Sequence, residues 1–503
     1  MARKKELVRS PTIVASLGVI VALAFLLFPK LKAKLNGKND HEKDSPSIAV
    51  LPFENVNNNP ELAYFSDGLA EDIRDDLSRI KGLKVCARTS SFQFRGNIAN
   101  VRQIGEKLRA NTLLDGSLQI QDDRIVVSVR LIDTKDGSQI WTGQYSENMD
   151  NISALQGRIT SAVAEKLQIE STKIDLQIPA KKSAPGKEAY AFYLKGRSFW
   201  NLRTPSDLKK GIDLFRQAIA LDSAYAAAYS GLADCYTALG YGSFMAPREA
   251  FPRALEAATK ALQIDSTLAE PHASLGYYKF YYEWDWAAAE QEFRASIARN
   301  ANYEIAYDWY GYYLTAMRRY DEARIILQKA GELDPLSVPI STDMGFSFYY
   351  GGNYDQAISV LKESLQKSPT FPLAHLWLGR AYQAKNRYKE AISEYKATME
   401  TTVGWPVALA AIGNVYGESG QKELARQILD TLISLSSNKF VTAYGVALVY
   451  AGLGEKEQAF LLLNKAFDER SNWLVWLKSD PRWAPISSDK RYGEMVNKVG
   501  LPH

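Results

Sequence analysis

Carboxylates are the most concentrated reactive groups in the first part of this sequence. Glu71, Asp72, Asp75 and Asp76 lie within six residues of one another, a density that acid–base catalysis or metal binding could use. The same stretch carries apolar residues at helical spacing, namely Leu69, Ile73, Leu77 and Ile80. Acids opposite such a stripe are typical of a solvated helix face. We therefore interpret the four carboxylates as surface groups.

Histidines offer no better candidate for catalysis. The four are far apart, and none has another histidine or a cysteine at metal-ligand spacing: His41, His272, His375 and His503. His375 lies two residues before Trp377 in a helical stretch, where a structural histidine is the commoner interpretation. The sequence contains no motif of a nucleotide-binding loop, a serine hydrolase, a kinase or a zinc protease. We expect no enzyme, no metal site and no cofactor.

Composition excludes further classes. The 503 residues carry a net charge of +4, 46% hydrophobic residues and 23% charged residues, as in ordinary globular proteins. Such a weak positive charge disfavours a nucleic-acid binder, which needs a concentrated basic patch. The two cysteines, Cys86 and Cys235, fall in different expected domains, so a disulfide between them is not expected.

An apolar run near the N-terminus predicts a membrane anchor. Thr12 to Phe28 contains no charged residue and as a helix reaches roughly 26 Å, slightly short of a hydrocarbon core. A cleaved signal peptide is the alternative, but no small-residue cleavage site follows directly. Basic residues flank both sides, so the orientation is weakly determined. The short preceding tail of 11 residues favours a bacterial inner-membrane protein crossing once, with its bulk periplasmic.

The next part of the chain has the pattern of a small α/β domain. Expected strands, recognised by apolar runs or by alternation, are Ser47 to Phe53, Lys84 to Ala87, Leu113 to Ile120, Arg124 to Ile132 and Ser138 to Tyr145. Expected helices are Leu62 to Ile80, Val101 to Arg109 and Ile152 to Leu167. Lys135-Asp136-Gly137 is a hairpin turn signal. These elements predict one mixed sheet with helices.

Seven ordered blocks of this domain carry a family resemblance: SIAVLPFENV, YFSDGLAEDI, LSRIKGLKV, ARTSSFQF, IGEKL, LLDGSLQ and VSVRLIDTKDGSQIWTGQY. They resemble the bacterial TolB amino-terminal-like (FlgO-like) domain over about 120 residues. The resemblance implies a non-catalytic α/β fold that often precedes repeat arrays. In that family the cassette is joined to a DNA-binding winged helix, a protein kinase or a class III cyclase. With 11 residues before the apolar run, we expect none of these effectors here.

Two short polar motifs of the domain could serve ligands. Asp67-Gly68 and the run Arg88 to Ser91 would sit near strand ends, where open α/β sheets tend to bind small molecules or partners. The alternative, which we favour, is a helix-entry turn and a loop whose polar side chains satisfy backbone groups.

From about residue 188 the sequence repeats every 34 residues. Three series show the period: Gly311, Gly345, Gly379, Gly413 and Ala447; Ala323, Ala357, Ala391, Ala425 and Ala459; Leu327, Leu361, Tyr395, Leu429 and Leu463. The residue types and period resemble tetratricopeptide repeats (TPR), antiparallel helix pairs that stack into a superhelix. Looser repeats begin near Gly196, Ala233 and Gly276, which gives about eight, and the last residues resemble a terminal cap.

The TPR resemblance implies a binding surface on the concave face of the first helices. Counted from the small residue at position 8, positions 5, 9 and 12 face that groove. The candidate partner-binding residues are Tyr277, Phe280, Asp308, Tyr312, Phe346, Tyr349, Arg380 and Asn414. Aromatic residues and arginine are frequent anchors of such surfaces. The alternative is that they pack inside a tight superhelix and bind nothing. Position 5 lacks lysine, so capture of an acidic C-terminal tail is not expected.

Together these patterns predict a transmembrane helix, a small α/β domain with a mixed sheet and an all-α TPR superhelix. The expected segments are a basic tail 1–11, an anchor 12–28, a linker 29–46, the TolB-like domain 47–170, a linker 171–187, the TPR array 188–470 and a cap 471–503. The predicted function is a membrane-tethered, non-enzymatic scaffold or sensor that binds a protein or extended peptide, and that could form homo-oligomers. The alternative is a ligand-sensing regulatory subunit of a separate cyclase, kinase, transcription regulator or transporter.

Overall fold

A computed structural model describes residues 46–57, 63–96, 100–121, 124–169 and 186–501. The expected anchor 12–28, with its basic tail, lies outside these residues, as do nearly all of the two linkers 29–46 and 171–187. Within the described ranges no helix has both the length and the apolar content needed to cross a membrane.

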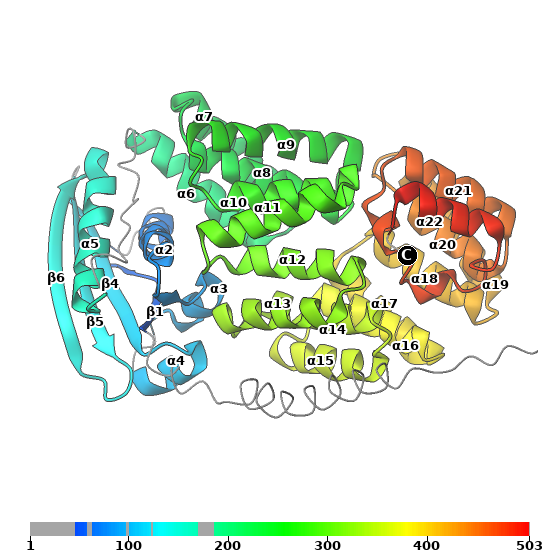
Figure 1. Cartoon of the computed structure of the whole chain (residues 1–503), viewed down its shortest axis with the longest axis horizontal. Helices are drawn as coiled ribbons and strands as arrows, with labels where there is room; N and C mark the ends of the chain where they lie inside the picture. The colour runs from blue at the N-terminus through cyan, green and yellow to red at the C-terminus, as the bar shows by residue number, and fades with distance from the viewer. Residues whose placement is uncertain (1–45, 58–62, 97–99, 122–123, 170–185, 502–503) are drawn as a thin grey trace, which may run out of the picture. The chain divides into compact units, whose positions relative to one another are not determined.

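The first folded part contains the mixed sheet that alternating and apolar runs predicted (Figure 1). Its strands are β1 Ser47–Val50, β2 Glu54–Asn55, β3 Lys84–Val85, β4 Thr112–Gln121, β5 Arg124–Asp133 and β6 Gln139–Asn148. The order is β3-β1-β4-β5-β6, with β2 beside β4. Strands β3, β1 and β4 run parallel, whereas β4, β5 and β6 form an antiparallel meander. The two edges are therefore the short β3 and the long β6.

Helices cover the two faces of this sheet unequally. On one face α2 Ala63–Ser78 and α5 Ile152–Lys166 share a core with β1, β4 and β5. On the other face α4 Val101–Leu108 packs on β1 and the start of β4 through Ile104 and Leu108. Two short elements, α3 Arg88–Ser91 and the 3₁₀ turn η2 Phe92–Phe94, follow β3.

Eight helix pairs follow in the described residues. The first helices of the pairs are α6 Lys187–Leu202, α8 Ala226–Tyr241, α10 Glu270–Tyr278, α12 Glu304–Ala316, α14 Val338–Tyr350, α16 Pro372–Ala384, α18 Pro406–Glu418 and α20 Ala443–Leu453. The second helices are α7 Pro205–Leu221, α9 Pro247–Ile264, α11 Trp286–Arg299, α13 Tyr320–Leu333, α15 Tyr354–Lys367, α17 Tyr388–Thr401, α19 Lys422–Leu435 and α21 Lys456–Asp468. The turns η5 Asn472–Trp476 and η6 Pro481–Trp483 and the helix α22 Lys490–Val499 close the chain. The expected helical repeat array is confirmed.

Small residues set the spacing of each pair, as the repeat pattern predicted. A Cβ atom added at Gly311 would lie 2.5 Å from the side chain of Leu327, and one at Gly345 would lie 2.6 Å from Leu361. Since such distances are far inside van der Waals contact, only glycine lets the two backbones approach this closely. The periodic Ala323 and Ala357 on the facing helices are fully buried.

Two early repeats depart from the regular spacing. The extra residue of the third pair is absorbed by a π-helical turn, η4 Lys279–Glu283, at the end of α10, as is usual for single insertions in helices. The longer connection between α8 and α9 contacts the far end of the array, because Trp405 Nε1 donates to Gly242 O at 3.0 Å and Arg248 Nε donates to Asp468 O at 2.6 Å. The insertion therefore joins the second repeat to the late repeats.

The array covers the short edge of the sheet. Val85 N in β3 donates to Asn302 Oδ1 at 3.0 Å, and Ala87 N donates to Leu333 O at 2.9 Å. The amide of Asn302 in turn donates to the carbonyl oxygens of Ser78 and Leu83. Loops between repeats thus take the place of a neighbouring strand and satisfy backbone groups that an open edge would expose.

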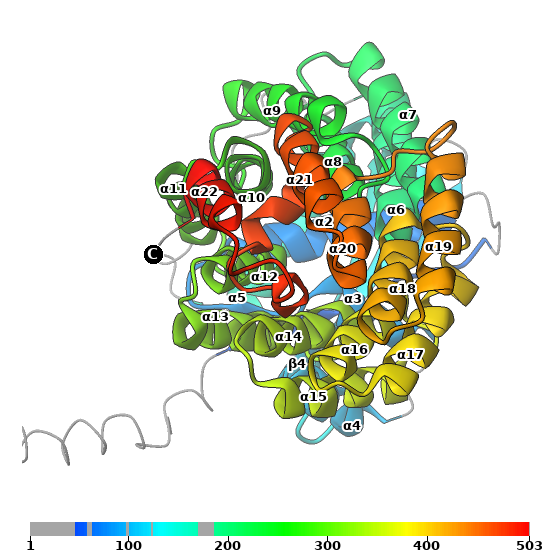
Figure 2. The same cartoon turned by 90° about the vertical axis from the view of Figure 1, so that its right-hand side faces the viewer.

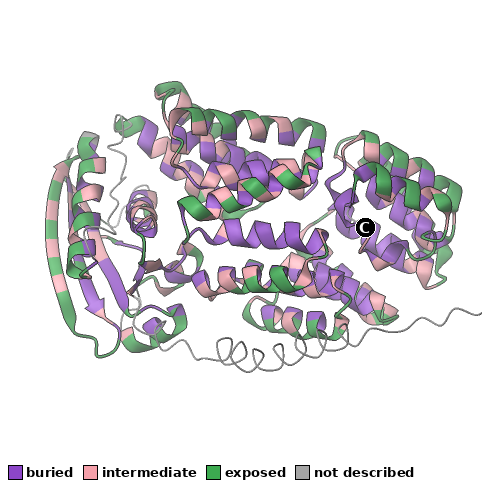
Figure 3. Ribbon diagram, viewed as in Figure 1, coloured by how far each residue is buried: buried purple, intermediate pink, exposed green. Residues whose placement is uncertain are grey.

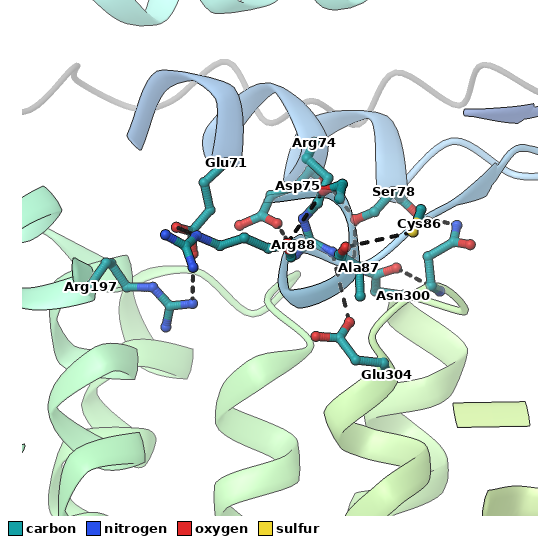
Figure 4. A network of polar contacts seen from close by, with 12 residues as sticks. Glu71, Arg74, Asp75, Ser78, Cys86, Ala87, Arg88, Arg197, Asn300 and Glu304 are labelled. Carbon is teal, nitrogen blue, oxygen red and sulfur yellow. Dashed lines mark hydrogen bonds and ion pairs between the residues drawn. The ribbon is translucent and has the colours of Figure 1, made fainter. Parts of the chain in front are cut away.

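The acidic face of α2 contacts the array and is not solvated, which corrects our sequence interpretation. Glu71 is 6% exposed and pairs with Arg88 at 2.8 Å and with Arg197 of α6 at 3.0 Å (Figure 4). Burial opposes ionisation of Glu71, but the two arginines more than offset it and hold its pKa below the usual range. Arg74 lies 3.7 Å from Glu304 of α12. A helix has the same pattern of apolar residues whether its charged face meets water or forms ion pairs with another domain. The sequence could therefore not distinguish the two cases.

The two polar motifs of the α/β domain also serve this contact. Ser90 Oγ donates to Asp334 Oδ1 at 2.5 Å and accepts from Leu336 N at 2.8 Å. A Cβ atom at Gly68 would lie 2.4 Å from Leu194 of α6. Asp67 accepts from Arg95 at 2.7 Å. The interpretation that we favoured, a helix-entry turn and a loop, is wrong, because Asp67 and Gly68 lie inside α2 and Arg88–Ser91 is the short helix α3.

Candidate functional site

The eight candidate groove residues are all buried. Their exposed fractions are 2% for Tyr277, 0% for Phe280, 9% for Asp308, 4% for Tyr312, 1% for Phe346, 0% for Tyr349, 2% for Arg380 and 0% for Asn414. They do lie on first helices of neighbouring pairs, from α10 to α18, apart from Phe280 in the turn η4 that follows α10. The expectation of an open groove is wrong for this structure, where these helices appear buried along most of their length (Figure 3). Binding of a partner by these residues stays a prediction.

The chain's own C-terminal segment, residues 471–486, covers much of the concave face. Trp476 is at its centre, 1% exposed, with its ring stacked on Tyr350 at 4.4 Å between ring centroids. Phe346 meets the same indole edge-to-face at 4.9 Å, and Phe280 does so at 6.1 Å. Helices that are far apart in sequence, α10 and α14, therefore share one tryptophan. In Figure 2 the red C-terminal residues lie between the early green helices and the late orange ones.

A second tryptophan of the segment extends this contact toward the second repeat. The ring of Trp473 stacks on that of Tyr241 in α8, and its Nε1 donates to Ser243 Oγ at 3.0 Å. The guanidinium of Arg380 lies 5.1 Å from the ring of Trp473 and 4.2 Å from that of Trp377. Arg380, which we expected to bind a partner, thus makes cation–π contacts with a segment of its own chain.

A buried ion pair anchors the end of the segment. Arg482 and Asp480 are 3% and 0% exposed at their side chains and approach to 2.6 Å. Asp480 also accepts from the hydroxyls of Tyr349 at 3.2 Å and Tyr444 at 3.3 Å. Burial would raise the pKa of Asp480, but the attraction of Arg482 prevails and lowers it below the usual value. The pair remains charged inside the array because every carboxylate oxygen has donors.

Two further carboxyls lie together on the concave face. Tyr312 Oη donates to Asp343 Oδ1 at 2.5 Å. Burial raises the pKa of Asp343 to about 7, although the bond from Tyr312 opposes that rise. The pKa of Asp308 is raised well above its usual value by burial and by the neighbouring Asp343. Burial thus favours the neutral forms of both carboxyls, which donate as well as accept hydrogen bonds.

Asn414 belongs to a hydrogen-bond chain between neighbouring repeats. Its Oδ1 accepts from Gln383 Nε2 at 2.6 Å, and its Nδ2 donates to Leu448 O at 2.8 Å. Gln383 Oε1 accepts from Tyr395 at 2.7 Å. The chain joins the sixth, seventh and eighth pairs, so Asn414 acts here as a link between repeats.

Sequence reasoning missed Trp473, Trp476, Asp480, Arg482 and Asp343. The first four lie after the last repeat, where no periodic position shows which surface a side chain reaches. A signal was present, because three tryptophans within eleven residues, Trp473 to Trp483, are far more than a simple cap needs. Among the described residues, no cluster of three histidine, cysteine or acidic side chains could hold a metal ion.

Two family models match parts of the chain. Residues 350–414 match the tetratricopeptide repeat, so the repeats are tetratricopeptide repeats. Residues 43–162 match the second domain of HilA/YgeH-like transcriptional regulators. The TolB-like resemblance of the same stretch stays a prediction.

Curated relatives match only part of this chain. A putative adenylate cyclase 3 of Rhizobium meliloti is 30% identical over 190 residues, which is 37% of this chain and 32% of that protein. Transcriptional regulator HilA of Salmonella typhimurium is 21% identical over 317 residues, 61% of this chain and 54% of that protein. The chain therefore matches between about a third and about half of these relatives' lengths. Among solved structures, PilF of Pseudomonas aeruginosa aligns with a TM-score of 0.31 and 22% identity over 41% of this chain and 93% of PilF.

Proposed function

We propose that this protein is a non-enzymatic interaction scaffold whose concave TPR face binds an extended protein segment, held near a membrane by residues 12–28. The TPR repeats favour a protein-binding role. The observation that carries the proposal is the seating of residues 471–486 on the predicted groove. Trp476 inserts among Phe280, Phe346 and Tyr350, the kind of aromatic anchor that dominates peptide recognition.

The resident segment defines what a partner must offer. It presents two tryptophans three residues apart and an Asp-x-Arg sequence whose charges pair with each other. A partner segment must supply comparable aromatic area, since each tryptophan buries on the order of 200 Å². It must also compete with a tethered segment, whose effective concentration is on the order of millimolar. Partner binding therefore requires high affinity or prior release of residues 471–486.

A peptide supplied in trans tests this proposal. A fluorescent peptide of residues 471–486 is titrated against the full chain and against the Trp476→Ala chain, with binding followed by anisotropy. We expect saturable binding only to the variant, because its own segment has lost its main anchor. A peptide that itself carries Trp476→Ala should not bind, and Trp141→Ala in β6 is the control chain that should stay closed. A folded Trp476→Ala chain that does not bind the native peptide contradicts the proposal.

The regulatory-subunit alternative is favoured by the names of the relatives. One is described as a putative adenylate cyclase and another as a transcriptional regulator, so the shared cassette could serve an effector located on a separate chain. Under this alternative the α/β domain binds a small ligand. Because ion pairs lock that domain to the array, a ligand should raise the melting temperature of the whole described unit. Calorimetric titration of the full chain with ATP and cyclic AMP tests it; one molecule bound per chain favours the alternative, and no heat opposes it.

A further inference from the structure

The outer edge of the sheet differs from its inner edge. Strand β6 runs for ten residues, Gln139–Asn148, and pairs on one side with β5. No strand of the described residues pairs with its other side, where β6 ends the sheet (Figure 1). Alternate backbone N–H and C=O groups along that side consequently lack a strand partner, a template on which another strand can add.

This edge carries few of the features that usually prevent strand addition. Natural edges carry lysines, prolines or inward charges, whereas β6 contains no lysine, arginine or proline. Its one charged residue, Glu147, forms an ion pair with Arg158 of α5 at 3.0 Å. Ile140 is 41% exposed at the start of the strand. The edge is long and nearly uncharged, and it is regular from Trp141 onward, after a shift of register with β5 between Leu131 and Ile132.

A shallow groove runs beside the edge, between β6 and α5. Its volume is about 540 Å³, and its lining residues are Tyr145, Ala154, Gly157, Arg158, Ser161, Ala162 and Glu165. A Cβ atom at Gly157 would meet nothing within 4 Å, although glycine inside a helix costs roughly 1 kcal/mol relative to alanine. Small residues on α5 therefore leave room for side chains of a strand placed beside β6.

We propose that the strand placed there is β6 of a second copy, paired antiparallel about a two-fold axis at Gly143. In this register Trp141 of each copy lies opposite Tyr145 of the other, and Gln139 lies opposite Glu147. Aromatic cross-strand pairs of this kind are favourable. The two Glu147 side chains are about eight residues apart, roughly 27 Å along the strands, so no like charges meet. A register centred on Gln144 would instead place Trp141 against the charged Glu147.

The geometry of each aromatic side chain fits this register. In one copy Trp141 and Tyr145 close over Gly143, where an added Cβ atom would lie 2.5 Å from Trp141 and 2.8 Å from Tyr145. Tyr145 also lines the groove beside α5. The opposite Trp141 of a second copy would enter next to Tyr145, where the small residues of α5 leave space. A symmetric dimer thus fills both grooves with the same two residue types.

Charge placement on the solvent face tests both the dimer and its register. Thr142 and Gln144 are exposed, and in the proposed register each faces the other across the axis. The monomer should tolerate Thr142→Glu, because residue 142 lies opposite Arg130 of β5 and the two charges attract. In a dimer of the full chain carrying Thr142→Glu and Gln144→Glu, four carboxylates would face one another across the two-fold axis. Thr142→Glu with Gln144→Lys instead opposes acids to bases.

Sedimentation velocity over a wide concentration range measures the result, with circular dichroism to show that each variant is folded. We expect a monomer–dimer equilibrium for the parent chain, a dimer dissociation constant raised at least tenfold by the two glutamates, and dimerisation retained by the Glu/Lys variant. A parent chain that stays monomeric, or a dimer that tolerates both glutamates, overturns the proposal. Loss of the dimer in the Glu/Lys variant overturns the register, since that pair of charges is repulsive only where residue 142 or residue 144 meets itself.

Discussion

We propose two regions of this molecule as acceptors of an extended chain, the concave face of the TPR array and the outer edge of the sheet at β6. The first is filled by residues 471–486 of the same chain, with Trp476 1% exposed. The second has no partner strand among the described residues. Both are rich in aromatic residues, yet their side chains are buried in one and half-buried in the other. Aromatic side chains therefore mark both candidate surfaces, whereas their exposure distinguishes the surface that the chain's own residues cover from the one that they leave open.

The largest expected effect comes from removing the central anchor of the filled region. Trp476→Ala should lower the free energy of unfolding by about 3–5 kcal/mol, because it opens a cavity among Phe280, Phe346 and Tyr350. Trp141→Ala in β6 should cost clearly less, since that indole is only partly buried. Urea unfolding with linear extrapolation measures both. Equal losses of unfolding free energy in Trp476→Ala and Trp141→Ala would contradict the stated difference in packing between the two regions.

Ion pairs give a second contrast of similar size. Arg482→Met should cost about 3–5 kcal/mol, because it leaves the carboxylate of Asp480 buried without its counter-ion. Arg158→Met removes the pair with Glu147 beside β6, where the two side chains are 49% and 25% exposed, and should cost under about 1 kcal/mol. The same unfolding measurement applies. A cost under 1 kcal/mol at Arg482 would show that water enters the filled groove.

A smaller effect is expected where the array caps the short sheet edge. Asn302→Ala removes the acceptor of Val85 N and the donor to Ser78 O and Leu83 O. Leaving such buried backbone groups unsatisfied should cost about 1–3 kcal/mol. The exposed Asn148 at the end of β6 is the matched control, and Asn148→Ala should change the free energy of unfolding by less than about 0.5 kcal/mol. Equal effects would mean that the two edges are equally open.

The smallest effect is a pH dependence that Asp343 contributes on the concave face. Asp343 has a pKa of about 7 in the folded chain and 3.8 as its ordinary value. Because the folded state holds this proton more tightly, its contribution to stability is complete below pH 3.8 and is lost as pH rises through 7. Asp343→Asn should therefore flatten part of the fall in melting temperature between pH 4 and 7. An unchanged slope would show that Asp343 ionises normally in the fold.

The sequence predicted the elements well and their mutual contacts poorly. The 34-residue period placed Gly311, Ala323 and Leu327 correctly, because residue size at fixed spacing directly determines how two helices pack. The acids of α2 were misplaced, since an amphipathic pattern does not say whether its polar face meets water or another domain. The burial of Arg380 and its neighbours was only the alternative to the open groove that we predicted. It depends on the path of residues 471–486, which follow no repeat and reach the second repeat through tertiary contacts.

Hydrogen exchange of the full chain tests the central claim most directly, namely that residues 471–486 behave as a bound segment on the concave face. If they do, their amides should exchange through an opening of lower free energy than global unfolding, while the amides of α12, α14 and α16 stay protected. Addition of the isolated 471–486 peptide should then leave exchange of the full chain unchanged, because the resident segment occupies the face, and should slow exchange of these helices in the Trp476→Ala chain. Exchange of the segment only together with the array, at the free energy of global unfolding, would contradict the account and make these residues an inseparable part of the core.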